Sequence, residues 1–286
     1  MSARHLLALP LIAALLAACS GTGTTPAAGV AVSPASATTA PSSAEPSAAG
    51  GGGLTIYAAA SLKGALDKAK AAYEGANPGT TLTISTDSSS ALETQIEQGA
   101  PADVFLSADQ ANAKKLADGG LADGGPVSFA ANKLTIVVPT SNPAGIATPA
   151  DLARSGVKVI GAGDNVPITK YATQLVANLA TQPGYPADFV AAYTSNVVSR
   201  EDNVKALIAK IELGEGDAGI VYVTDARAST KVMTIDVSDA ANVPATYDGV
   251  VVKASGNAAT ARAFLEWLAG PDGQAVLGGL GFLPPS

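Results

Sequence analysis

Residues 81–109, TLTISTDSSSALETQIEQGAPADVFLSAD, show most clearly which class of fold to expect. Its first residues, Thr81-Leu-Thr-Ile-Ser85, are β-branched and apolar and predict a strand. Residues 90–98 predict a helix, which Ser90 and Glu93 would open as a capping box. The apolar run Val104-Phe-Leu106 then predicts a buried strand. A strand, a helix and a strand of these lengths are typical of a parallel sheet.

The same alternation continues on both sides of this stretch. Strands are expected at 54–58, 133–139, 157–160, 218–222, 232–237 and 247–252, with a strand fragment at 197–198. Helices are expected at 61–74, 109–117, 167–180, 202–212 and 258–268, with a short helix at 148–152. The pattern predicts an α/β protein with parallel or mostly parallel sheets and helices on both faces.

The start of the chain has the features of a secreted lipoprotein. A charged beginning with Arg4 is followed by an apolar run too short to span a bilayer. Small residues then precede Cys19, which resembles the lipobox of bacterial lipoproteins, so we expect a signal peptide at 1–18 and lipidation of Cys19. The alternative is an ordinary signal peptide. Residues 19–53 are rich in Ser, Thr, Ala, Pro and Gly and predict a disordered tether.

The charge and the rare residues exclude several functions. The net charge is −7, and removal of 1–18 with Arg4 makes it −8, so the chain lacks the basic surface of a nucleic-acid binder. The only histidine is His5, and the only cysteine is Cys19. The expected mature chain therefore has no free imidazole or thiol for Ser-His-Asp or Cys-His catalysis or for common zinc sites. We expect no enzyme.

Four small polar loops each join a predicted strand to a predicted helix, at 58–62, 87–92, 164–169 and 199–204. In an α/β sheet such loops gather at the carboxyl ends of the strands. Each helix start offers unpaired N–H groups and the positive end of a dipole. Together they predict an anion site that needs no Lys or Arg. Taken singly, each loop is better explained by helix capping.

Several runs resemble the periplasmic molybdate-binding protein family of ABC importers, in order from about 54 to 282. They are Tyr57-Ala-Ala-Ala-Ser61-Leu, the run from Ser88 to Asp109, Val166-Pro167 with Tyr171-Ala172, and Gly219-Ile-Val-Tyr222. The resemblance implies a two-lobed class II periplasmic-binding-protein fold. Each lobe would be a mixed, mostly parallel sheet flanked by helices, with the ligand cleft between the lobes. Lobe I is expected to comprise 54–135 and 240–286, and lobe II 136–239.

The resemblance also implies the ligand donors. They are Ser61, Ser89, Ile168, Val204 and Tyr222. The serines would donate through hydroxyl and backbone N–H groups, Ile168 and Val204 through backbone N–H groups, and Tyr222 through its hydroxyl. Ser88 or Ser90 in place of Ser89, and Asn203 in place of Val204, remain alternatives.

The function implied is capture of molybdate or tungstate outside the cytoplasm and delivery to the permease of an ABC importer. The protein would be a monomer anchored to the cell membrane by lipid, with no cofactor, and molybdenum would be present only as the bound oxyanion. Two alternatives remain. One is binding of sulfate, phosphate or another small anion, and the other is a surface hydrolase using Ser and Lys or paired carboxylates.

Overall fold

The computed structural model describes residues 52–285. The predicted signal peptide at 1–18, the lipidation of Cys19 and nearly all of the predicted tether at 19–53 lie outside the described residues. These three remain predictions. The first strand begins at Gly53, one residue before the expected start of the folded part. In the described part of the chain, no helix is long and apolar enough to cross a membrane.

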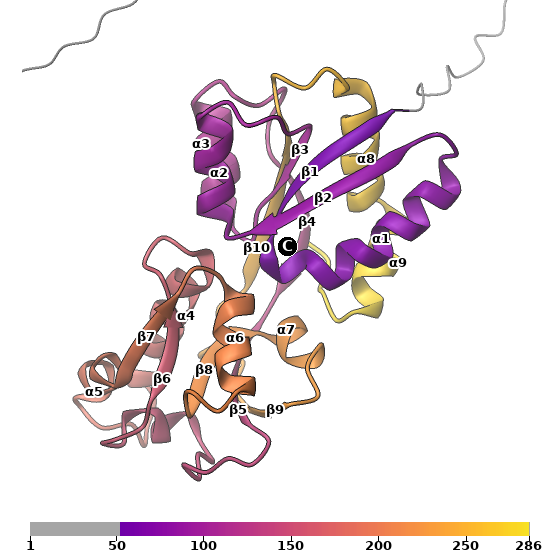
Figure 1. Ribbon diagram of the computed structural model, residues 1–286. Coiled ribbons are helices and arrows are strands. Elements are labelled where there is room, and N and C mark those ends of the chain that lie inside the picture. Colours follow the sequence, from indigo (N-terminus) through magenta and orange to yellow (C-terminus); the bar gives the residue numbers. More distant parts are fainter. Residues whose placement is uncertain (1–51, 286) are drawn as a thin grey trace, which may run out of the picture. The chain divides into compact units, whose positions relative to one another are not determined.

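The described residues form two five-stranded sheets (Figure 1). In the first sheet the strand order is β2-β1-β3-β10-β4, and in the second it is β7-β6-β8-β5-β9. The first contains β1 (Gly53–Ala59), β2 (Thr81–Asp87), β3 (Val104–Leu106), β4 (Val127–Asn132) and β10 (Ala245–Val251). The second contains β5 (Leu134–Pro139), β6 (Val159–Ala162), β7 (Val197–Glu201), β8 (Ala218–Tyr222) and β9 (Val232–Ile235).

Helices flank both sheets. Those of the first sheet are the short η1 (Ala60–Leu62), α1 (Lys63–Ala76), α2 (Ser89–Glu97), α3 (Gln110–Asp118), α8 (Ala258–Ala269) and α9 (Pro271–Gly279). Those of the second are η2 (Pro149–Ala153), α4 (Pro167–Ala180), α5 (Phe189–Asn196), α6 (Val204–Glu212) and α7 (Val223–Arg227). The two-lobed α/β fold class is therefore confirmed.

Both sheets begin with the same winding. In the first, β1 leads through α1 to β2 on one side, and β2 leads through α2 back across β1 to β3. The second repeats this order with β6, β7 and β8. Crossovers between parallel strands are right-handed. When the chain adds the next strand on the other side of the first strand, the connecting helix therefore lies on the opposite face of the sheet. The loops that diverge at that point leave a crevice beside the carboxyl ends of the strands.

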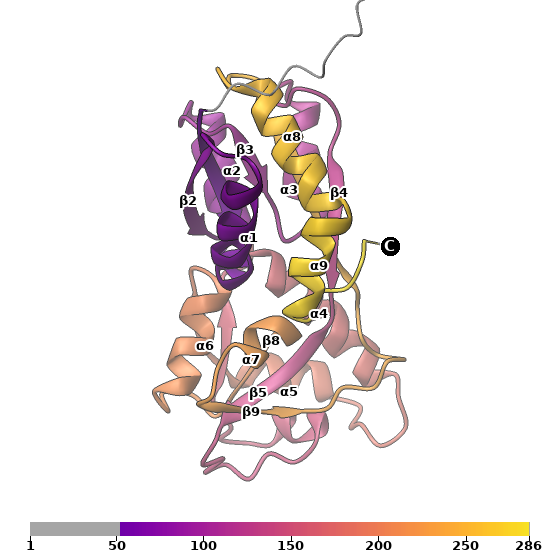
Figure 2. The same ribbon diagram turned by 90° about the vertical axis from the view of Figure 1, so that its right-hand side faces the viewer.

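The core of the first lobe shows helices on both faces. All three residues of β3 are buried, which fits a continuous apolar run between two helical layers. Phe105 packs in a cluster with Leu92 and Leu116 from α2 and α3. Val104 and Leu106 belong to the main core, which also contains Leu66 of α1 and Phe264 of α8. In Figure 2, α1 and α8 lie near one another in front of the first sheet.

Half of the strand pairings are parallel, which is fewer than the strand–helix alternation suggests. In the first sheet β10 pairs antiparallel with β3 and β4, and in the second β5 pairs antiparallel with β8 and β9. The reason is that the chain passes between the sheets twice, at Lys133 and at 236–244. Strand β5 begins at Leu134, before the predicted start of lobe II at 136. The exact lobe boundaries remain predictions.

Four α-helix starts differ from the sequence expectation, since α1 begins at Lys63 and α3 at Gln110, and α2 and α6 differ as well. The residue that caps α2 is Ser88 and not Ser90, because the Ala91 N–H donates to the Ser88 Oγ at 3.3 Å. Glu93 does not complete a capping box, since its buried carboxylate pairs with Lys115 at 2.9 Å. Helix α6 begins at Val204 and not at 202, because Asn203 caps it. Strand β4 and helices α5, α7 and α9 are absent from the expected elements.

Candidate functional site

One cavity lies at the carboxyl ends of strands from both sheets. All five residues predicted as ligand donors line it, which are Ser61, Ser89, Ile168, Val204 and Tyr222. The rest of its lining is Ala59, Ala60, Ser88, Ala108, Val166 and Pro167. Its empty volume, the open mouth included, is about 210 Å³. The space inside it that is open to the centre of a water-sized sphere is only about 10 Å³, so the cavity suits a solute of few atoms.

Three helices begin at this cavity. Ser89 and Val204 are the first residues of α2 and α6, and Ile168 is the second residue of α4, after Pro167. The N–H groups of a first helical turn have no partner inside the helix, and the helix dipole adds partial positive charge there. Proline fits the first position because it has no N–H to satisfy. The three helix starts therefore give the cavity a positive potential without any charged side chain.

The serine triplet divides its roles. Ser88 caps α2 with its Oγ, which lies 3.5 Å from the Ser90 Oγ. The Ser89 Oγ is buried and accepts the N–H of Ala108 at 3.0 Å. Because this oxygen already accepts a hydrogen bond, the hydroxyl proton of Ser89 is free to be donated into the cavity. The geometry thus favours Ser89 over its two neighbours, and Ser90 does not line the cavity.

The neighbouring Asn203 is engaged elsewhere. Its Oδ1 accepts the N–H groups of Lys205 and Ala206, both at 3.1 Å, and so caps α6. Its Nδ2 donates to Asp87 Oδ1 at 3.0 Å, which joins the start of α6 to the end of β2 in the other sheet. Asn203 does not line the cavity, whereas Val204 does. The geometry therefore favours Val204 as the donor at this loop.

Tyr222 ends the fully buried strand β8. A side chain at Gly219 in this strand would meet the Leu207 side chain at 2.7 Å, so glycine is what allows β8 to pack closely under α6. The Tyr222 side chain is buried, and its hydroxyl has no hydrogen-bond partner among the described residues. Burial raises the pKa of this hydroxyl well above the ordinary phenol value, so it stays protonated and can donate.

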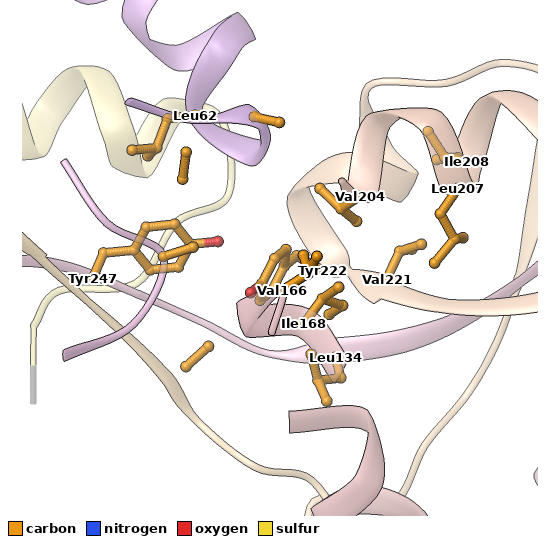
Figure 3. Packing of buried hydrophobic residues seen from close by; sticks show 14 of the residues in the cluster. Leu62, Leu134, Val166, Ile168, Val204, Leu207, Ile208, Val221, Tyr222 and Tyr247 are labelled. Carbon is orange, nitrogen blue, oxygen red and sulfur yellow. The ribbon is translucent and has the colours of Figure 1, made fainter. Parts of the chain in front are cut away.

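Ser61 lies in η1, directly after β1, and contacts a residue that the sequence did not indicate. Its Oγ is 3.0 Å from the hydroxyl of Tyr247 in β10. Figure 3 shows Tyr247 and Tyr222 side by side, with both hydroxyl oxygens directed to the space between the lobes. Their ring centroids are 5.7 Å apart. No sequence motif marks Tyr247, because the contact joins residues 186 positions apart.

The charged side chains near these helix starts face acidic partners instead of the cavity. Lys205 Nζ lies 2.7 Å from the buried Asp225, and Lys170 Nζ lies 3.6 Å from Asp109 in the other lobe. Among residues 52–285, no charged side chain lines the cavity. Within residues 52–285, no group of three or more His, Cys, Asp or Glu side chains gathers to hold a metal ion. What the cavity offers is hydrogen-bond donors, which suit an anion.

Comparisons with known proteins show the family and the fold of the chain. The model of the bacterial extracellular solute-binding protein family matches residues 54–283. The molybdate-binding protein ModA of Mycobacterium tuberculosis (strain ATCC 25618 / H37Rv) is 35% identical over 233 residues, which are 81% of this chain and 85% of that protein.

Two solved structures share the fold. The periplasmic molybdate-binding protein of Azotobacter vinelandii is 24% identical with a TM-score of 0.69, covering 82% of this chain and all of that one (100%). The sulfate-binding protein SubI of Mycobacterium tuberculosis H37Rv is 21% identical with a TM-score of 0.71, covering 81% and 86%. The fold alone therefore does not choose between these anions. The family match over 54–283 establishes that the chain belongs to the bacterial extracellular solute-binding proteins.

Proposed function

We propose that this protein binds molybdate or tungstate in the cavity between its lobes and delivers the oxyanion to the permease of an ABC importer. The ligand donors are the hydroxyl and N–H groups of Ser61 and Ser89, the N–H groups of Ile168 and Val204, and the hydroxyl of Tyr222. The 35% identical relative that is named as a molybdate-binding protein supports this ligand. The proposal includes no cofactor and no catalytic step.

The observation that carries the proposal is the buried, unpartnered hydroxyl of Tyr222. A buried polar group without a hydrogen bond costs free energy and calls for an explanation. The hydroxyl faces a cavity that also receives three helix starts and the spare proton of Ser89. One anion with several acceptor oxygens would satisfy all of these donors at once, which a neutral apolar solute would not.

The set of hydrogen-bond donors also indicates which anion fits the cavity. Molybdate, tungstate and sulfate are fully deprotonated near neutral pH and have only acceptor oxygens. Phosphate keeps a proton there, which needs an acceptor, and the lining side chains include no carboxylate. We therefore expect phosphate to bind poorly. Among the deprotonated tetrahedral anions, which carry the same charge, the size of the closed cavity would set the preference.

Binding would act through closure of the cleft. Ser61 and Ser89 belong to the lobe of the first sheet, and Ile168, Val204 and Tyr222 to that of the second. An anion that bonds to both sets of donors gains most of its contacts only when the lobes are together. It therefore shifts the population of the protein toward the closed arrangement. The permease would recognise that arrangement.

The proposal places the protein on the outer side of the cell membrane, as a monomer held by a lipid on Cys19. The sequence around Cys19 and the Ser- and Pro-rich segment after it support an anchored protein with a tether. Metabolic labelling with a radioactive fatty acid tests this part. A Cys19→Ser variant that still incorporates the label would contradict the assignment of the lipid to Cys19.

Thermal unfolding of the purified chain tests the ligand. Molybdate, tungstate, sulfate and phosphate are added separately, each from low to high concentration. A ligand that binds only the native state raises the midpoint by an amount that grows with its concentration. We expect a rise with molybdate and tungstate and none with phosphate. A rise with sulfate alone would keep the mechanism and change the substrate, and no rise with any of the four would refute the proposal.

A further inference from the structure

Four buried polar side chains form a chain of contacts behind the cavity. The Ser61 Oγ lies 3.0 Å from the Tyr247 hydroxyl. The Asn132 Nδ2 lies 3.5 Å from the same hydroxyl and donates to the Thr224 Oγ1 at 2.8 Å. Thr224 belongs to α7 in the lobe of the second sheet, and the other three residues belong to that of the first. The chain of contacts thus connects the cavity to the opposite lobe.

The direction of the hydrogen bond between Tyr247 and Ser61 follows from counting donors and acceptors. The Tyr247 hydroxyl is fully buried, so its proton needs an acceptor nearby. Its two polar neighbours are the Ser61 Oγ and the Asn132 Nδ2, and an amide nitrogen cannot accept. The Asn132 amide is oriented by its Oδ1, which accepts the N–H of Lys133 at 3.0 Å. Tyr247 must therefore donate to Ser61.

This direction decides what Ser61 can do. Once its oxygen accepts the Tyr247 proton, the hydroxyl proton of Ser61 has to point elsewhere, and the side chain lines the cavity. The same arrangement occurs at Ser89, whose oxygen accepts the Ala108 N–H. Both serines are thus set as donors by a second hydrogen bond. At Ser89 the backbone supplies that bond, and at Ser61 Tyr247 alone supplies it among the residues that the structure describes.

We infer that Tyr247 is a positioning residue for oxyanion binding, which fixes the Ser61 hydroxyl as a donor toward the ligand, with Asn132 holding Tyr247 from behind. The inference rests on the proposed function. Without the Tyr247 hydroxyl, the Ser61 hydroxyl rotates among several orientations, only some of which reach the ligand. Binding then has to restrict that rotation and weakens accordingly.

The packing around Tyr247 allows its hydroxyl to be removed without loss of the ring contacts. The Tyr247 ring contacts Phe129, Tyr222 and Phe282 edge to face, with centroids 6.2, 5.7 and 5.6 Å away. These contacts involve the ring and not the hydroxyl, so Tyr247→Phe keeps them. Tyr73 offers a matched control, since it is also buried in the same lobe and packs edge to face on Phe264 at 5.0 Å, away from the cavity.

The experiment is a double-mutant cycle on the full chain, with the molybdate affinity measured by titration calorimetry. The variants are Tyr247→Phe, Ser61→Ala and both together, with Tyr73→Phe as control. We expect Tyr247→Phe to weaken binding about two- to tenfold, the usual range for one net hydrogen bond. In the Ser61→Ala background the same change should have no further effect, because the hydroxyl that it orients is gone. Tyr73→Phe should bind like the wild type.

Two results would overturn the inference. One is a Tyr247→Phe variant with wild-type affinity. The other is an equal loss of affinity in the wild-type and Ser61→Ala backgrounds, which would mean that Tyr247 acts on the fold and not through Ser61. Failure of the proposed function looks different, because the wild type itself would then give no binding heat with molybdate. Urea unfolding of each free variant verifies that it is folded before the titration.

Discussion

Tyr222→Phe should raise the free energy of unfolding of the ligand-free protein and lower its affinity for the oxyanion. The change removes only the hydroxyl and keeps the ring in its contacts with Tyr171 and Tyr247. In the free protein that hydroxyl is buried, and no described residue forms a hydrogen bond with it. A group of this kind costs roughly 1–3 kcal/mol. The variant should therefore gain up to about that much free energy of unfolding, a direction opposite to that of most core substitutions.

When the ligand is bound, the loss of the Tyr222 hydroxyl is unfavourable. A hydrogen bond to a charged acceptor contributes roughly 1.5–3 kcal/mol, which corresponds to an affinity about 10- to 150-fold weaker when it is lost. The loss should be smaller than that caused by Ser61→Ala or Ser89→Ala, because the Tyr222 ring still closes the cavity. Ligand should consequently raise the unfolding midpoint of the variant less than that of the wild type.

The assay is urea unfolding of both proteins, without ligand and with saturating molybdate, together with titration calorimetry. Tyr73→Phe is again the matched control and should change neither the affinity nor the stabilisation by ligand. If Tyr222→Phe were less stable than the wild type without ligand and bound molybdate equally well, the hydroxyl would not be reserved for the anion. The reasoning about the site would then be refuted.

Three further predictions concern other contacts. Ser89→Ala should lower both the affinity and the stability of the free protein, the latter by roughly 1–3 kcal/mol in urea unfolding, because a buried N–H loses its acceptor; unchanged stability would contradict this. Asn203→Asp keeps the helix cap but places a second carboxylate next to Asp87, so the contact between the two sheets becomes repulsive. Calorimetry should then show roughly tenfold weaker molybdate binding. Wild-type affinity would exclude a role of this contact in closure. Burial raises the pKa of Asp225 from 3.8 to about 6, despite Lys205. Since the folded state holds that proton more tightly, stability should fall by about 2 kcal/mol as the pH rises from 4 to 6, and Asp225→Asn, followed by urea unfolding at each pH, should flatten this slope.

The sequence alone determined those features that local signals encode. The helix at 167–180 and the strand at 218–222 were predicted with the bounds that the structure has. Proline at the first helical position and a short run of apolar residues suffice for such elements. The idea of an anion site without basic side chains also came from local signals, namely polar loops before helices. The resemblance to a known family added a prediction of which residue in each loop donates to the ligand.

Contacts between distant residues were decided only by the tertiary structure. The sequence places the start of α2 only to within one or two residues, because several consecutive residues there are polar and each could cap a helix. The structure shows that Ser88, and not Ser90, caps α2. The antiparallel directions of β5 and β10 follow from the two passages of the chain between the sheets, which no local pattern records. The pairing of Tyr247 with Ser61 joins residues 186 positions apart. Side chains of this kind are placed by the packing of whole layers, so their roles become visible only when the chain has folded.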